Sequence, residues 1–125
     1  MAKFLIAVDG SEIALRAVGR AIATIGEYRV APEVVLVTVH PPVPYAGRAK
    51  QLLGQEALDA YYREESEAQL KDARAALDRA GVKYTVRTSI GDPATEIVRI
   101  AASEGVDQIF IGTHGRGKVG GLVLG

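Results

Sequence analysis

The sequence predicts an α/β protein with an open parallel sheet and helices on both faces. Apolar runs of strand length alternate with longer amphipathic segments, an order typical of parallel sheets with right-handed crossovers. The first two runs, residues 4–8 and 34–40, are almost continuously apolar, which indicates strands covered on both faces. Because the 125 residues show no linker and no internal repeat, we expect a single domain over residues 1–125.

The composition excludes several classes of function. Fifteen Lys and Arg residues balance fifteen Asp and Glu residues, whereas nucleic-acid and membrane-surface binding need a basic excess. The chain has no cysteine, which excludes disulfides, a thiolate nucleophile and a cysteine metal site. The first apolar run is too short for a signal peptide or a membrane span. We therefore expect a cytoplasmic protein with no nucleic-acid or membrane partner.

The first strand leads into a helix with one apolar stripe, residues 13–25, which Gly26 is expected to end. Asp9 lies between these two elements and has two interpretations. With Glu12 it resembles a capping box, in which Asp9 is the N-cap. Alternatively, its carboxylate lies at the carboxyl end of a strand, where α/β proteins bind ligands, and contacts a ribose or a metal-bound water.

The second strand is followed by prolines that lead the chain out of the sheet. His40, at the end of this strand, is expected to be a hydrogen-bonded structural residue, because no serine or cysteine nucleophile stands near it in the sequence. Residues 45–55 are predicted to form a mobile loop. Within this loop, Arg48 and Lys50 fit a solvated surface better than a phosphate contact.

The second helix is predicted over residues 56–80, with a solvated charged face and with Tyr61 and Tyr62 in packing roles. Four positions form its buried stripe: Leu70, Ala73, Leu77 and Ala80. Residues 84–88 alternate between apolar and polar, which predicts an edge strand.

The third helix is expected to begin with Asp92 as N-cap and Pro93 as its first residue, and to end at Gly105. Four apolar positions are predicted to form its buried stripe: Ala94, Ile97, Val98 and Ala101. A fourth strand follows over residues 109–111.

A glycine-rich loop follows this last strand. Its glycines stand at positions 112, 115, 117, 120, 121 and 125. Glycine lets the backbone approach a ligand closely, and successive free N–H groups form a concavity that suits phosphate oxygens. A strand followed by such a loop is where open α/β sheets bind nucleotides. The alternative is a flexible, glycine-rich tail with no ligand.

Three glycine patterns overlap in this loop. The P-loop pattern G-x-x-x-x-G-K-[ST] fails, because Val119 stands where a hydroxyl must hold Mg²⁺. The pattern G-x-G-x-x-G, which begins at Gly115, requires an acidic residue about 20 positions later, and the sequence stops at Gly125 before that position. The third pattern, G-x2-G-x9-G, is met by Gly112, Gly115 and Gly125.

The third pattern, together with A-V-D-G-S after the first strand and G-D-P-A-T-E-I before the last helix, resembles the universal stress protein family. The resemblance covers essentially the whole chain. It implies a Rossmann-like sheet, similar to that of the adenine nucleotide alpha hydrolases, with strand order 3-2-1-4-5. It also implies that the chain binds ATP, with or without Mg²⁺.

By position, the resemblance implies a nucleotide site made of ten residues: Ala7, Val8, Asp9, Val39, Ile111, Gly112, Gly115, Arg116, Gly117 and Gly125. Val39 would face the adenine, while Ile111 and Gly112 would lie under the ribose. The loop residues from Gly115 to Gly117 would lie toward the phosphates.

Members of this family continue beyond the glycine loop with a helix and a fifth strand, which often builds a homodimer. This sequence ends at Gly125, so we expect a chain that lacks its last helix and strand. The fourth strand would then be left as a bare apolar edge. The partners implied by the resemblance are an adenine nucleotide and a second copy of the chain.

The sequence hypothesis is therefore an ATP-binding universal stress protein with a regulatory role in the stress response. No catalytic or metal-binding residue is predicted, because no general base, metal cluster or nucleophile–base pair stands out, and ATP hydrolysis would be slow at most. The alternative is a nucleotide-free, dimeric protein-interaction module of the same fold. Replacement of Gly112 or Gly115 by valine is expected to abolish nucleotide binding and to leave the fold intact.

Overall fold

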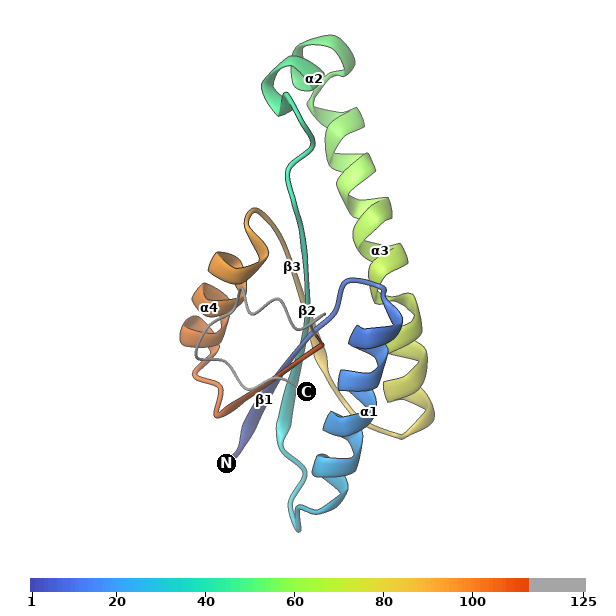
Figure 1. Ribbon diagram of the computed structural model, residues 1–125, viewed down its shortest axis with the longest axis vertical. Coiled ribbons are helices and arrows are strands. Elements are labelled where there is room, and N and C mark those ends of the chain that lie inside the picture. Colours follow the sequence, from blue (N-terminus) through green and yellow to red (C-terminus); the bar gives the residue numbers. More distant parts are fainter. Residues whose placement is uncertain (113–125) are drawn as a thin grey trace.

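The computed structural model of the protein describes residues 1–112. Its elements, in chain order, are β1 (Lys3–Ala7), α1 (Glu12–Gly26), β2 (Glu33–His40), α2 (Ala46–Leu53), α3 (Gln55–Arg79), β3 (Thr85–Ile90), α4 (Pro93–Glu104) and β4 (Gln108–Ile111) (Figure 1). The four strands of this region form one parallel sheet in the order β3-β2-β1-β4. The predicted parallel α/β architecture is confirmed, with the first four strands in the predicted order and β3 at an edge.

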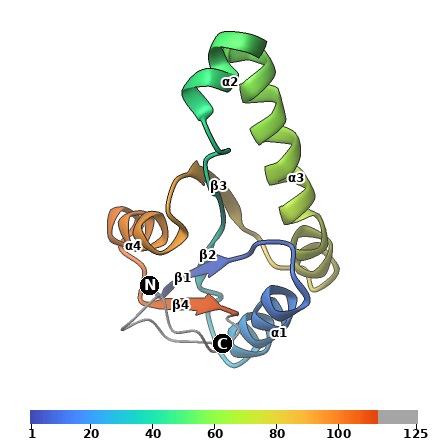
Figure 2. The same cartoon turned by 45° about the horizontal axis from the view of Figure 1, so that its top comes forward.

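Helices cover both faces of the sheet: α1 and α3 lie on one face and α4 on the other (Figure 2). Successive residues of β1 therefore face different helices. Phe4 and Ile6 pack with α1 and α3, while Leu5 and Ala7 pack with α4, and none of the four is more than 4% exposed. Because side chains alternate along a strand, a strand that is buried on both faces must be apolar at every position.

The start of α1 differs from the predicted capping box. The N-cap is Ser11, whose hydroxyl oxygen accepts a hydrogen bond from the N–H of Ala14 at 3.1 Å. Gly10, with φ of +86°, turns the chain before the helix, so that Glu12 is the first helical residue and not the third. Asp9 accepts the N–H of Ser11 at 2.9 Å and caps no helix. The prediction of Asp9 as N-cap was therefore wrong.

The start and end of α4 were predicted correctly. Asp92 is the N-cap, Pro93 is the first helical residue, and Gly105 ends the helix in the left-handed conformation with φ of 65°. The predicted buried stripe was partly wrong, because Val98 is half exposed while Ile100 is fully buried. On a helix that buries Ile97, the residue three positions later, Ile100, also faces the sheet. Val98, directly after Ile97, faces away from it.

Residues 45–55 do not form the predicted mobile loop. They include α2, which begins after Tyr45 and ends at Gly54, both with positive φ. The sequence of α2, A-G-R-A-K-Q-L-L, contains good helix formers. None of its residues is buried, so the sequence shows no apolar periodicity by which the helix could be predicted. Gly54 separates α2 from α3, and both extend beyond the end of the sheet (Figure 1).

The long helix α3 agrees with its predicted extent, and three of its four predicted core positions are buried: Leu70, Ala73 and Leu77. Ala80 lies past the end of the helix and is exposed. No helix among residues 1–112 is long and apolar enough to cross a membrane.

Candidate functional site

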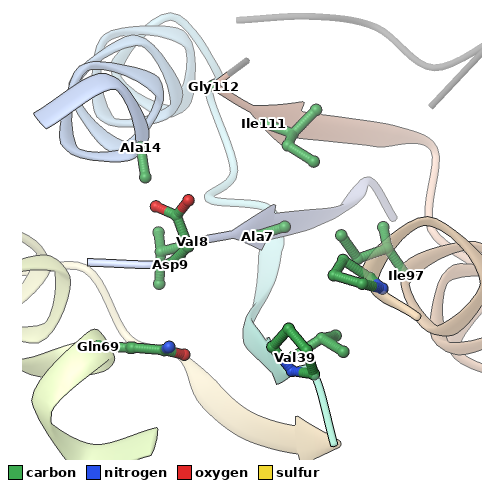
Figure 3. A pocket seen from close by; sticks show the side chains of 11 residues that line it. Ala7, Val8, Asp9, Ala14, Val39, Gln69, Ile97, Ile111 and Gly112 are labelled. Carbon is green, nitrogen blue, oxygen red and sulfur yellow. The ribbon is translucent and has the colours of Figure 1, made fainter. Parts of the chain in front are cut away.

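A pocket of about 370 Å³ opens at the carboxyl ends of β1, β2 and β4 (Figure 3). The helices α1, α3 and α4 complete its walls. The chain leaves β1 toward β2 on one side and later returns to place β4 on the other side, so the strand order reverses at β1. Open α/β sheets bind ligands at such a switch point, outside the carboxyl ends of the strands.

Six of the predicted site residues line this pocket together: Ala7, Val8, Asp9, Val39, Ile111 and Gly112. They come from three strands or from the residues directly after them, and in the sequence they are separated by up to about a hundred positions. The other four predicted site residues, Gly115, Arg116, Gly117 and Gly125, lie outside the described residues.

Five further lining residues were missed by sequence reasoning: Ala14, Pro41, Gln69, Pro93 and Ile97. Pro41 and Pro93 follow the carboxyl ends of β2 and β3, so the rule that these ends share one edge of the sheet would have found them. No sequence signal marks Gln69, which reaches the pocket from the middle of α3.

The floor and one wall of the pocket are apolar. Ala7, Val39, Ile97 and Ile111 belong to the buried cluster between the sheet and α4, and each is at most 8% exposed. Pro41 and Pro93 add rigid apolar surface at the rim. A slot of this kind suits a flat apolar group, since ligand pockets are lined mainly by hydrophobic side chains with a few placed polar groups.

Gln69 is the polar lining residue that α3 contributes to the pocket. It is held by Thr38, a buried residue whose hydroxyl lies 2.7 Å from the carbonyl oxygen of Val8 and 2.6 Å from the side-chain oxygen of Gln69. A hydroxyl carries one proton, so these two oxygens compete for it. The contact holds the Gln69 amide against the end of β1, where Figure 3 shows it directed into the pocket.

Asp9 is the one titratable side chain among the lining residues that the structure describes. It is exposed, and its Oδ1 atom accepts the N–H of Ser11. Because Ser11 caps α1, the second oxygen of Asp9 is available to a ligand. Residues 1–112 contain no group of three or more His, Asp or Glu side chains arranged to hold a metal ion.

Gly112 allows β4 and α1 to approach closely. A Cβ atom at this position would lie 2.6 Å from the carbonyl carbon of Ile13 and in contact with its carbonyl oxygen. Real Cβ atoms do not come this close to backbone, so any side chain at position 112 would displace the start of α1. Valine at this position is therefore expected to shift the start of α1, contrary to the expectation that it would leave the fold intact.

His40 has a structural environment, as predicted. Its Nδ1 atom lies 2.6 Å from the carbonyl oxygen of Pro41, and its Nε2 atom lies 3.5 Å from Glu65. The rings of Tyr61 and Tyr62 pack against it edge to face, at centroid distances of 5.9 and 5.5 Å. Tyr62 is buried and accepts the N–H of Val43 at 3.0 Å. These contacts tie the segment after β2 to α3.

A charged cluster flanks the pocket where β3 meets α4. The Arg99 guanidinium and the Ser89 hydroxyl both donate to the Glu96 carboxylate. These hydrogen bonds, the one from Arg99 first, lower the pKa of Glu96 to about 2. Glu96 is therefore ionised at neutral pH, and it joins β3 to the first turns of α4 near the pocket residues Pro93 and Ile97.

The sheet order and the position of the pocket define a doubly wound α/β protein that carries a ligand-sized pocket at its switch point. The chain belongs to the universal stress protein family, whose sequence profile matches residues 1–125. The family resemblance stated from the sequence is thereby confirmed.

Individual relatives support this assignment. Universal stress protein MJ0531 of Methanocaldococcus jannaschii is 30% identical over 123 residues, which are 98% of this chain and 71% of the relative. The solved structure of protein MJ0577 from the same organism superposes with a TM-score of 0.70 at 30% identity, covering 93% of this chain and 77% of that one.

A third relative was solved with a ligand. The crystal structure of the universal stress protein family protein At3g01520 from Arabidopsis thaliana, with AMP bound, superposes with a TM-score of 0.67. The match covers 100% of this chain and 90% of that one, at 16% sequence identity. At this identity the likeness shows a shared fold.

Proposed function

We propose that the protein binds ATP, with or without Mg²⁺, in the pocket at the carboxyl ends of β1, β2 and β4, and that it has a regulatory role in the stress response. The observation that carries the proposal is the convergence of six predicted nucleotide residues on one pocket of about 370 Å³. These residues were assigned from the sequence alone, and they come from strands that are distant in the sequence.

The two sides of the pocket suit the two ends of a nucleotide. The adenine ring fits the apolar slot beside Val39 and Ile97, and the ribose lies near the available carboxylate oxygen of Asp9. The phosphates extend toward the loop that follows Gly112. Mg²⁺ bound with nucleotide phosphates takes one or two carboxylates from the protein, so Asp9 fits as a single ligand for it.

Related proteins support this class of ligand. The Arabidopsis protein that shares this fold was solved with AMP bound, which supports an adenine nucleotide as the ligand of this pocket. A cytoplasmic location, expected from the short first apolar run, and a homodimer, expected from the family resemblance, are part of the same proposal. Among the described lining residues, Asp9 has no nucleophile or second titratable group beside it.

The first measurement identifies any nucleotide that the purified protein carries. The protein is denatured, and the released small molecules are separated by chromatography beside ATP, ADP and AMP standards. We expect a near-stoichiometric adenine nucleotide, or micromolar binding of added ATP by calorimetry. A protein that releases no nucleotide and gives no binding heat with any of the three would contradict the proposal.

The second measurement compares Asp9→Asn with the matched variant Asp59→Asn, which removes the same charge from the exposed surface of α3. Asparagine still accepts the N–H of Ser11, so the turn before α1 is kept. Loss of a charged hydrogen bond to the ribose or metal should weaken ATP binding about tenfold. Asp59→Asn should bind as the wild type does, and equal affinity in all three proteins would remove Asp9 from the site.

The alternative of a nucleotide-free interaction module is favoured by one observation, the exposed apolar side chains of α2. The two hypotheses differ in the outcome of the first measurement. A folded protein that carries no nucleotide and binds none when it is added would favour the interaction module.

A further inference from the structure

Gln69 enters the pocket from the side opposite to its apolar wall. Figure 3 shows the side chain extending from α3, while Ile97 lies on the opposite side, on α4. Gln69 is half-buried and is followed by the fully buried Leu70, which holds this part of α3 against the sheet. Gly10 packs against the same backbone, since a Cβ atom on Gly10 would lie 3.3 Å from the Cα atom of Gln69. The amide of Gln69 is therefore presented from a fixed backbone position.

The orientation of this amide follows from its buried neighbours. The Thr38 hydroxyl lies between the carbonyl oxygen of Val8 and the amide of Gln69. With the amide oxygen Oε1 turned toward Thr38, two oxygens share the single proton of the hydroxyl, and one of them has no donor. With the amide flipped end over end, its Nε2 group donates to Thr38 and Thr38 donates to Val8, so that each group has a partner.

The flipped orientation determines what the pocket offers to a ligand. A buried carbonyl oxygen without a donor costs free energy, and the flipped amide avoids this cost. Gln69 then directs Oε1 into the pocket. A carbonyl oxygen accepts hydrogen bonds and cannot donate them, so a ligand must bring a donor to this point.

We propose that Gln69 selects the base of the nucleotide, because its side-chain oxygen accepts a hydrogen bond from the exocyclic amino group of adenine. This inference rests on the proposed function, which places the adenine ring beside Val39. Thr38 directly precedes Val39, so the amide that Thr38 holds lies next to the strand end that borders the base. Thr38 is a positioning residue, since it acts on the base only through Gln69.

The same contact discriminates against 6-oxopurine nucleotides. Hypoxanthine and guanine carry a carbonyl oxygen where adenine carries its amino group, so two acceptors would face each other. Gln69 could donate to this oxygen only by turning its Nε2 group into the pocket, and Thr38 would again have one proton for two oxygens. A site built to bind a hydrogen-bond donor rejects an analogue that lacks it. We therefore expect 6-aminopurine nucleotides to bind about tenfold more tightly.

The ribose hydroxyls are the other donors of a nucleotide, and Asp9 has a carboxylate oxygen available for them. If Gln69 bound the ribose instead of the base, it would strengthen the binding of all purine nucleotides equally. A comparison of two nucleotides that differ only in the base therefore distinguishes the two contacts.

The test is calorimetric titration with ATP and with inosine triphosphate, which share the ribose and the three phosphates. The wild type should prefer ATP about tenfold. Gln69→Met keeps the length of the side chain and removes the amide, so the preference should fall to about twofold or less. The matched variant Gln51→Met makes the same change on the exposed helix α2 and should keep the wild-type preference.

A second pair of variants tests the positioning by Thr38. Thr38→Val removes the hydroxyl, so the amide can turn either end to the base and the preference for ATP should fall. Thr38→Ser restores the hydroxyl and should restore the preference. Each preference compares two ligands on one protein, so a loss of stability that affects both ligands alike does not change it.

Equal affinity of the wild type for ATP and inosine triphosphate would overturn the inference and leave the proposed function standing. A Gln69→Met protein that keeps the wild-type preference would also overturn it, including the case in which both nucleotides lose affinity equally. A wild-type preference in Thr38→Val would overturn the positioning by Thr38. A folded wild-type protein that binds neither nucleotide would contradict the proposed function itself.

Discussion

The pocket end of the sheet and the helix α2 differ in how their residues are held. Around the pocket, Ala7, Val39 and Ile111 are buried between two layers, and Gly112 touches the backbone of α1. In α2, no residue is buried at all. One region is fixed by packing and the other is held by few contacts with the rest of the chain.

A substitution at the pocket end is expected to change the free energy of unfolding, whereas a substitution in α2 is expected to change chiefly the binding of a partner. A change at the pocket end removes or overfills packed volume, so its effect on a ligand is mixed with its effect on folding. A change in α2 leaves the core intact, so its effect on a partner can be measured directly.

The largest expected difference is between two leucines. Leu36→Ala removes a fully buried side chain from β2 and should lower the free energy of unfolding by about 2–5 kcal/mol. Leu52→Ala removes an exposed side chain from α2 and should change it by no more than about 0.5 kcal/mol. Urea denaturation measures both, and similar losses would mean that α2 packs against the rest of the protein.

A smaller difference is expected between two glycines, whose substitutions should change the stability in opposite directions. Gly112→Ala should destabilise the protein by about 1–3 kcal/mol, because the new methyl group meets the backbone of Ile13. Gly47→Ala adds the same group to open space within α2 and should stabilise the helix by about 0.5–1 kcal/mol. If urea denaturation shows that Gly112→Ala is neutral, the close approach of β4 and α1 is not tight.

The smallest expected effect is a dependence on pH at Glu96. Its pKa of about 2 lies below the ordinary value of 4.5, so folding favours the ionised form. The stability that it contributes is fully present above about pH 4.5 and is lost as the pH falls toward 2. Glu96→Gln should therefore flatten the decline in thermal midpoint between these pH values.

The matched variant for this pH experiment is Glu64→Gln, which removes an exposed carboxylate from the surface of α3. It should leave the acid decline as it is in the wild type. Identical pH profiles for Glu96→Gln and wild type would show that the hydrogen bonds from Arg99 and Ser89 do not favour the ionised carboxylate in solution.

Most of the fold could be predicted from the sequence because most elements carry a local signal. The continuously apolar runs of β1 and β2 indicated burial on both faces, and Asp92 with Pro93 marked the start of α4. The predictions were wrong where the local sequence signal was weak, or where two neighbouring residues carried the same signal. Asp9 and Ser11 are both good N-cap residues, and the positive φ of Gly10 decides between them.

The same limit applied to α2 and to the site. An exposed helix has no apolar periodicity, so residues 45–55 were predicted as a loop. Ala7, Val39 and Ile111, which lie at or near the ends of strands, could be assigned to the site through the family resemblance. Gln69 enters the pocket from the middle of a helix, and its position depends on how α3 lies across the sheet, which no local pattern encodes.

The pairing of β1 with both β2 and β4 has a consequence for how the chain folds during synthesis. Lys3 and Asp107 exchange backbone and side-chain hydrogen bonds at 2.7 and 2.8 Å across 104 positions. β1 leaves the ribosome early and can pair with β2, but its other edge stays open until β4 has emerged. Such long-range parallel pairings close slowly. A nascent chain therefore leaves one edge of β1 unpaired until nearly all of the described residues have been made.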